Sequence, residues 1–122
     1  MPYQNKWEHK GIRRVFTNKT SGKEIFWANL DLQKDSRFDD VNYVINDFTK
    51  LVDFEVSETE VDMITGSDDA ASIKNTNIKI AIVATLEPFL VWVELYLEMM
   101  RNSPFECKVF SNVNDAYKWI SG

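Results

Sequence analysis

The sequence predicts an α/β domain in which a mainly parallel sheet is covered by helices. Short runs of β-branched and aromatic residues alternate with segments of helical periodicity, the pattern of strands joined by crossover helices. Two Ser-x-x-Glu capping boxes, at residues 21–24 and 57–60, mark where two of the helices begin. The chain has 122 residues, 44% of them hydrophobic, and no Gly/Ser-rich linker, so we expect one domain over residues 1–122.

The N-terminal part is expected to form a hairpin and a first helix. Apolar and polar residues alternate over residues 3–8, Gly11 marks a tight turn, and residues 12–17 form a second run of strand character. The capping box at Ser21 then opens a helix, and residues 34–41 form a polar connection. We expect the first strand to lie antiparallel at an edge of the sheet.

The next strand is expected at residues 43–48, where a continuous apolar start suits a central position in the sheet. Asp47 is then the acid at the end of this strand. Parallel α/β sheets bind ligands at the carboxyl ends of their strands, so Asp47 stands where a site would be expected. The second capping box begins a helix after Ser57 that runs to about Asn75.

The C-terminal half adds two strands and two helices. Residues 78–84 give the clearest strand, because they form a short β-branched run that is apolar on both faces. Thr85 is expected to cap a helix that extends to about Arg101, followed by a strand at 106–110 and a helix at 112–120. The expected order is therefore β-β-α-β-α-β-α-β-α, with a five-stranded mixed sheet covered by helices.

Composition excludes several classes of function. A net charge of -5 argues against nucleic-acid binding, which needs a basic surface, but it suits a basic protein partner. The N-terminus has no signal-peptide core, and the longest apolar run, residues 89–93, is far short of the roughly 20 residues that a membrane span needs. Because Cys107 is the one cysteine, no internal disulfide can form. We expect a soluble cytoplasmic protein.

No residue pattern indicates catalysis, a cofactor or a metal. His9 is the single histidine, and the sequence has neither a nucleophile elbow nor a glycine-rich phosphate loop. Cys107 lies in an apolar strand, where a buried and unreactive thiol is expected. No set of cysteines and histidines could hold zinc. We therefore expect a protein that is not an enzyme and has no cofactor or metal site.

Several stretches along nearly the whole chain resemble the bacterial SpoIIAA-like proteins of the STAS-like superfamily, in a small stand-alone branch. These stretches are "MPYQNKWEHKGIRRVFTNKTSGKEI", "DSRFDDVNYVINDFT", "FEVSETEV", "NIKIAIVA" and "FECKVFSNVNDAYKWI". The last one, a strand followed by Phe-Ser and a helix ending in Ala-x-x-Trp-Ile, recurs in such proteins. The resemblance implies the SpoIIAA-like fold for residues 1–122.

Ser57 has two interpretations. As the first residue of a capping box it accepts a hydrogen bond from a free backbone N–H. In STAS-type anti-sigma-factor antagonists, a strand-end aspartate precedes a phosphorylatable serine at a helix start, and the resemblance places Asp47 and Ser57 at those positions. The motif here is Glu-Val-Ser-Glu instead of Asp-Ser-Ser-Gly, and seven acids over residues 53–69 would repel a phosphate. We expect a helix cap, with a phosphosite as the alternative.

The helix at residues 88–101 is more apolar than a helix on a sheet needs to be. Glu94, Glu98 and Arg101 fall on one narrow stripe, and the other roughly 240° of its surface is apolar. A neighbouring helix, a second subunit or a ligand must cover the excess. The residues expected to form an interface or an apolar ligand surface are Leu90, Val91, Trp92, Leu95, Tyr96, Met99 and Met100.

Two functional hypotheses follow. The first is a non-enzymatic cytoplasmic regulatory or protein-interaction module, a homodimer through helix 87–101 whose acidic segment 53–69 offers a surface to a basic protein partner. The alternative is a carrier or sensor of a small hydrophobic ligand, bound near the sheet by the aromatic and methionine residues of the same helix. Sheets of this general kind also occur in CRAL-TRIO lipid-binding folds, which is an analogy of fold alone.

Overall fold

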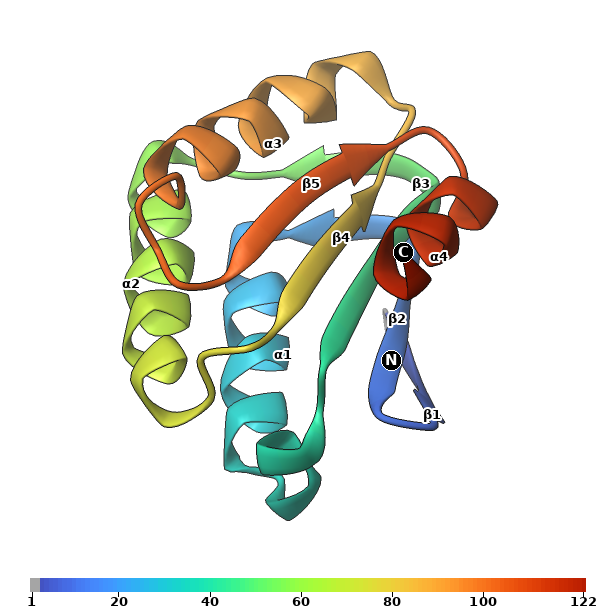
Figure 1. Cartoon of the computed structure of the whole chain (residues 1–122). Helices are drawn as coiled ribbons and strands as arrows, with labels where there is room; N and C mark the ends of the chain where they lie inside the picture. The colour runs from blue at the N-terminus through green and yellow to red at the C-terminus, as the bar shows by residue number, and fades with distance from the viewer. Residues whose placement is uncertain (1–2) are drawn as a thin grey trace.

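A computed structural model describes residues 3–122 as a five-stranded sheet in the order β1-β2-β3-β4-β5 (Figure 1). The strands are β1 (Tyr3–Glu8), β2 (Gly11–Ser21), β3 (Tyr43–Glu55), β4 (Lys79–Val83) and β5 (Glu106–Phe110). β1 pairs antiparallel with β2, and every later pair is parallel. The predicted α/β class, the element order and the antiparallel edge strand are confirmed.

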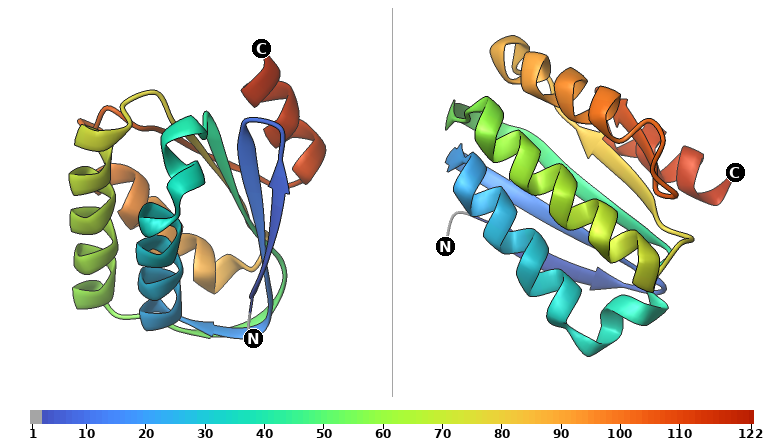
Figure 2. Two further views of the ribbon diagram at one scale, coloured as in Figure 1. Left: turned by 90° about the horizontal axis from the view of Figure 1, so that it is seen from below. Right: turned by 90° about the vertical axis from the view of Figure 1, so that its left-hand side faces the viewer.

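Helices cover the two faces of the sheet unequally. The helices are α1 (Gly22–Lys34), the 3-10 helix η1 (Ser36–Asp40), α2 (Glu58–Lys74), α3 (Glu87–Met99) and α4 (Val113–Ser121). α1, α2 and α3 pack on one face, and α4 packs alone on the other (Figure 2). The main core therefore lies beneath α1, α2 and α3, where alternate strand residues meet the apolar sides of the helices.

β2 and β3 are longer than the sequence predicts. The expected end of β3 near residue 48 is wrong, because the strand continues to Glu55 while β2 continues to Ser21. Beyond Asp47, β3 pairs only with β2, so the two strands extend past the rest of the sheet as a two-stranded arm. The exposed Thr49 and Lys50 look like a strand end in the sequence, but an arm with an open face accommodates such residues.

Helix starts follow the predicted caps except in α3. Ser21 and Ser57 both accept a hydrogen bond from the backbone N–H three residues ahead, as N-cap residues do. The predicted cap at Thr85 is wrong, because Leu86 is the N-cap residue of α3 and gives no side-chain bond. Pro88 in the first turn has no N–H, which reduces the number of donors that need a partner there.

The face beneath α4 is held by an ion pair and two tyrosine hydrogen bonds. The Arg13 guanidinium donates to Asp47 Oδ2 from Nε at 3.2 Å and from Nη2 at 2.7 Å. Glu8 accepts from the hydroxyls of Tyr43 and Tyr117 at 2.5 and 2.6 Å, which ties β1 to β3 and α4. Burial, helped by the bond to Glu8, raises the pKa of Tyr117 to about 12, so this hydroxyl remains a donor at neutral pH.

Two glycines allow a matched test of this packing. A methyl group on Gly11 would overlap the Tyr43 ring, whereas one on Gly66 would meet open space on α2. We expect Gly11→Ala to lower the free energy of unfolding by about 1–3 kcal/mol through overpacking. Gly66→Ala should raise it by about 0.5–1 kcal/mol through better helix propensity. Urea unfolding followed by circular dichroism measures both, and equal effects of the two substitutions would contradict the contact of Gly11 with Tyr43.

Candidate functional site

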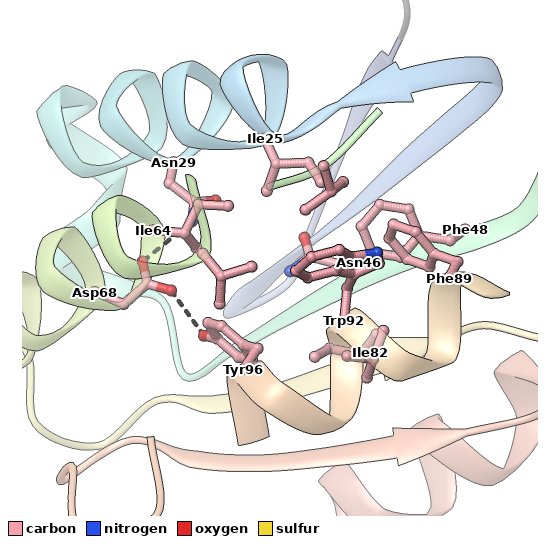
Figure 3. Close-up of a pocket in the computed structure, with 13 residues that line it drawn as sticks. Ile25, Asn29, Asn46, Phe48, Ile64, Asp68, Ile82, Phe89, Trp92 and Tyr96 are labelled. Carbon is pink, nitrogen blue, oxygen red and sulfur yellow. Dashed lines mark hydrogen bonds between the residues drawn. The ribbon is translucent and has the colours of Figure 1, made fainter. Parts of the chain in front are cut away.

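A pocket lies between the sheet and helices α1, α2 and α3, on the sheet face named the covered face after these three helices (Figure 3). It leaves about 60 Å³ in which the centre of a water-sized molecule can move. Nine of the thirteen lining side chains are hydrophobic. They come from α1, β3, the β3–α2 loop, α2, β4 and α3. The four polar lining residues are Asn29, Asn46, Asp68 and Tyr96.

The periodicity of each element brings its residues to the pocket. Asn46 and Phe48 are two apart on β3, so both side chains point to the covered face of the sheet. Helical spacing places Ile64 and Asp68 on one side of α2, four residues apart. On α3, the lining residues recur at the same spacing and end with Tyr96 at the far end of the pocket.

Arg14 of β2 is the centre of a buried polar network beside this pocket. Its side chain is on the covered face, and the residue is 2% exposed. Nε donates to Asn46 Oδ1 at 2.9 Å, and Nη2 donates to Asn29 Oδ1 at 2.5 Å. Nη1 is buried and has no hydrogen-bond partner within residues 3–122. Burial lowers the pKa of Arg14 to about 10, which still leaves the guanidinium charged at neutral pH.

Asp68 of α2 carries the opposite charge of the network. Its Oδ1 accepts from Asn29 Nδ2 at 3.1 Å, and its Oδ2 accepts from the Tyr96 hydroxyl at 2.7 Å (Figure 3). Gln33 Nε2 also donates to Oδ1, at 3.2 Å. The amide of Asn29 therefore stands between the guanidinium of Arg14 and the carboxylate. Burial raises the pKa of Asp68 to about 6, although the Tyr96 hydrogen bond and the charge of Arg14 oppose the shift.

Tyr96 and Cys107 extend the network to α3 and β5. The Cys107 sulfur lies 4.0 Å from the Tyr96 hydroxyl oxygen, within reach of a weak S–H hydrogen bond. Burial and the nearby carboxylate of Asp68 raise the pKa of Tyr96 well above its ordinary value. Burial also raises the pKa of Cys107 to about 12. The thiol is therefore protonated at neutral pH, but Cys107 is only partly buried and not buried as the sequence predicts.

The structure separates the seven α3 residues that the sequence proposed as one surface. Trp92 and Tyr96 line the pocket. Met100 is 2% exposed and belongs to the core, so its assignment to an interface or ligand surface is wrong. Leu90 packs partly against the same core. Val91, Leu95 and Met99 lie along one line of the helix away from the pocket, with Val91 68% exposed.

Asp47 is not the acid at the end of a strand. It lies inside β3 and is fully buried on the face beneath α4, away from the pocket. Burial alone would raise the pKa of Asp47, but hydrogen bonds from Thr49 and the ion pair with Arg13 outweigh it and lower the pKa. What remains of the prediction is that Asp47 is the last β3 residue to pair with β4. Its contacts indicate a structural role.

Ser57 forms the predicted capping box and is exposed. Its hydroxyl accepts from the Glu60 N–H at 3.3 Å, and Glu60 Oε1 accepts from the Ser57 N–H at 3.0 Å. Glu60 also lies against Gly22, so the cap joins the starts of α1 and α2. Five of the seven acids counted in this segment are exposed and Glu60 is partly so, whereas Asp68 is buried and belongs to the polar network.

Arg14, Asn29, Asn46 and Asp68 are the network residues that the sequence interpretation missed. Each one interrupts an apolar periodicity. Arg14 stands between Ile12 and Phe16 at inward strand positions, and Asp68 stands four residues after Ile64 on the packing side of its helix. A polar residue in the middle of such a pattern was the available signal, because a buried polar group needs specific partners.

No family model matches the chain, and no curated protein matches it in sequence. A similar solved structure is that of an uncharacterised protein of the DUF3478 family from Shewanella loihica PV-4. Its description states a SpoIIAA-like fold. The two chains are 13% identical and superpose with a TM-score of 0.49, over 97% of this chain and 91% of the other.

Two further findings bear on the kind of site. Within residues 3–122, no group of three or more histidine, cysteine, aspartate or glutamate side chains could hold a metal ion. None of the described helices is both long and apolar enough to span a membrane. The lining of the pocket itself offers apolar contact and the hydrogen-bonding groups of its four polar residues.

The raised pKa of Asp68 predicts a characteristic pH dependence of stability. Between the ordinary value of 3.8 and the folded value of about 6, the folded protein holds a proton that the unfolded chain releases. Stability should therefore fall as pH rises through this window, by roughly 3 kcal/mol in total at 1.36 kcal/mol per pKa unit. Asp68→Asn removes the titrating group and with it this pH dependence. The stability of the variant, relative to that of the unsubstituted protein, should therefore increase by about this amount as the pH is raised from 4 to 7.

Urea titrations of both proteins across this pH range measure the difference. Other carboxylates titrate alike in the two proteins and cancel in the comparison. Parallel stability curves would show that Asp68 has an ordinary pKa and is not buried in the network.

Proposed function

We propose that the chain is a non-enzymatic regulatory module of the cytoplasm that acts by binding a small apolar molecule in the pocket beneath α1, α2 and α3. The observation that supports this function is a mostly apolar cavity, with Phe89 and Trp92 among its aromatic lining residues, beside a buried polar network. Such a combination of apolar walls and a few oriented polar groups is typical of small-molecule sites.

The size of the pocket limits the ligand. One water needs about 10–15 Å³ of space for its centre, so the 60 Å³ of this cavity holds about four to six waters. Since each water occupies about 30 Å³ in the liquid, a molecule of benzene or toluene size matches this space. The proposed ligand is therefore a compact aromatic or short aliphatic molecule, or one such end of a longer molecule.

Toluene is a suitable first probe, because it has no polar group. Titration followed by proton–nitrogen NMR should shift signals of pocket residues, including the Trp92 indole, in a saturable way. Val56→Trp places a large ring at the wall of the pocket and should weaken toluene binding by about tenfold or more. The control is Ile73→Trp, because Ile73 is 85% exposed on α2 and does not line the pocket.

The control variant should bind toluene as the unsubstituted protein does. Absence of saturable shifts up to the solubility of toluene, or equal binding by the Val56 variant, would contradict the proposed function.

A protein-interaction role is the second candidate, and a specific surface favours it. Val91, Leu95 and Met99 recur every four residues on α3, and two of them are exposed at 68% and 37%. These three residues belong to the apolar surface of this helix that, from the sequence, a neighbouring helix, a second subunit or a ligand was expected to cover. This surface supports a homodimer through α3, with the exposed acids of the β3–α2 region left free for a basic protein partner.

Sedimentation velocity tests the homodimer. A dimer is expected at micromolar concentration, and Val91→Glu should weaken it by about tenfold or more, because burying a charge removes the gain from burying an apolar side chain. Ile73→Glu introduces the same charge on an exposed site of α2 and should leave the dimer intact. A monomer at all accessible concentrations would exclude this second function and leave the ligand site unaffected.

A further inference from the structure

The polar groups of the pocket differ in how far hydrogen bonds within the protein already occupy them. Both carboxylate oxygens of Asp68 already accept hydrogen bonds, two at Oδ1 and one at Oδ2. The hydroxyl of Tyr96 donates to that carboxylate and is therefore engaged as a donor. The acidic side of the pocket has little capacity left for a ligand that donates hydrogen bonds.

Asn46 provides a hydrogen-bond donor that the described part of the chain leaves unused. Its Oδ1 accepts from Arg14 Nε at 2.9 Å, and this bond fixes which end of the amide is oxygen, because a guanidinium can only donate. The two N–H groups of Nδ2 are then the free end of the side chain. Within residues 3–122 no hydrogen bond engages Nδ2, and this nitrogen is not among the buried atoms that lack a partner. Asn46 lies in the middle of the lining residues in Figure 3.

Arg14 adds positive charge behind this donor. The guanidinium is buried, binds Asn46 and Asn29 directly, and reaches its opposite charge on Asp68 only through the amide of Asn29. Its Nη1 is the one buried side-chain nitrogen or oxygen of residues 3–122 without a partner. Because this nitrogen is a donor that finds no acceptor, the network has more donors than acceptors. Leaving a buried polar group without a partner is costly.

We infer that the ligand of this pocket carries a carbonyl-type oxygen, which accepts a hydrogen bond from Asn46 Nδ2 while its apolar part fills the pocket. The oxygen belongs to a ketone, an ester, an amide or a carboxylate. This inference rests on the proposed function and specifies the chemical class of the molecule bound. Asn46 is the residue that determines specificity, and Arg14 positions it by holding its oxygen.

Four monosubstituted benzenes separate the alternatives. Toluene has no polar group, acetophenone has a neutral carbonyl, benzoate has a carboxylate, and aniline has a donor. Acetophenone should bind about three- to tenfold more tightly than toluene, the value of one hydrogen bond. Aniline should bind no more tightly than toluene. Tighter binding of benzoate than of acetophenone would identify a charged head group, and weaker binding would identify a neutral one.

The decisive variant is Asn46→Asp. It keeps the shape of the side chain and an oxygen for Arg14, but it replaces the free N–H groups with a second acceptor. The preference for acetophenone over toluene should disappear in this variant, and aniline should become the better ligand. Asn42→Asp, at an exposed residue before β3, adds the same charge outside the pocket and should keep the original preference.

The outcomes distinguish this inference from the proposed function. Equal binding of toluene and acetophenone by the unsubstituted protein, or an unchanged preference in the Asn46 variant, would overturn the inference and leave the apolar pocket standing. Failure of all four probes to bind would contradict both. Loss of folding in the Asn46 variant is checked by circular dichroism, and the comparison of acetophenone with toluene in the unsubstituted protein then decides.

Discussion

The arrangement of the covered face depends on one buried guanidinium. Arg14 stands among buried apolar side chains on β2, where a charge is tolerated only with specific partners. Those partners come from different elements: Asn46 from β3, Asn29 from α1 and, beyond Asn29, Asp68 from α2 with Tyr96 from α3. A network with members on all three of these helices and on the sheet fixes how the helices sit on it, which apolar packing alone specifies less strictly.

The same network explains why a pocket lies there. Amide and carboxylate side chains are bonded to one another in a fixed geometry, so they cannot rearrange to fill the space between the helices as apolar side chains do. The remaining volume is lined by apolar residues such as Ile64 and Trp92, with Asn46 as the polar residue that retains free donors. On the opposite face, the ion pair of Arg13 with Asp47 lies beneath α4.

Periodicity and capping chemistry predicted most of the fold, because both depend on residues close in sequence. The order of elements and the capping box at Ser57 follow from local patterns. The candidate site was less accessible. The sequence assigns both Val91 and Met100 to the apolar surface of this helix, and the packing of α3 exposes one and buries the other. Arg14 and Asp68 are 54 residues apart, and no local rule pairs them.

A double-mutant cycle between Arg14 and Asp68 tests directly whether the two residues belong to one buried network. The two charges do not touch, and the amide of Asn29 couples them in stabilising the fold. Urea unfolding of Arg14→Met, Asp68→Asn and the double variant should give a coupling energy of at least about 1 kcal/mol, with the double variant more stable than the sum of the single effects predicts. Additive effects, within about 0.5 kcal/mol, would contradict the existence of a single network.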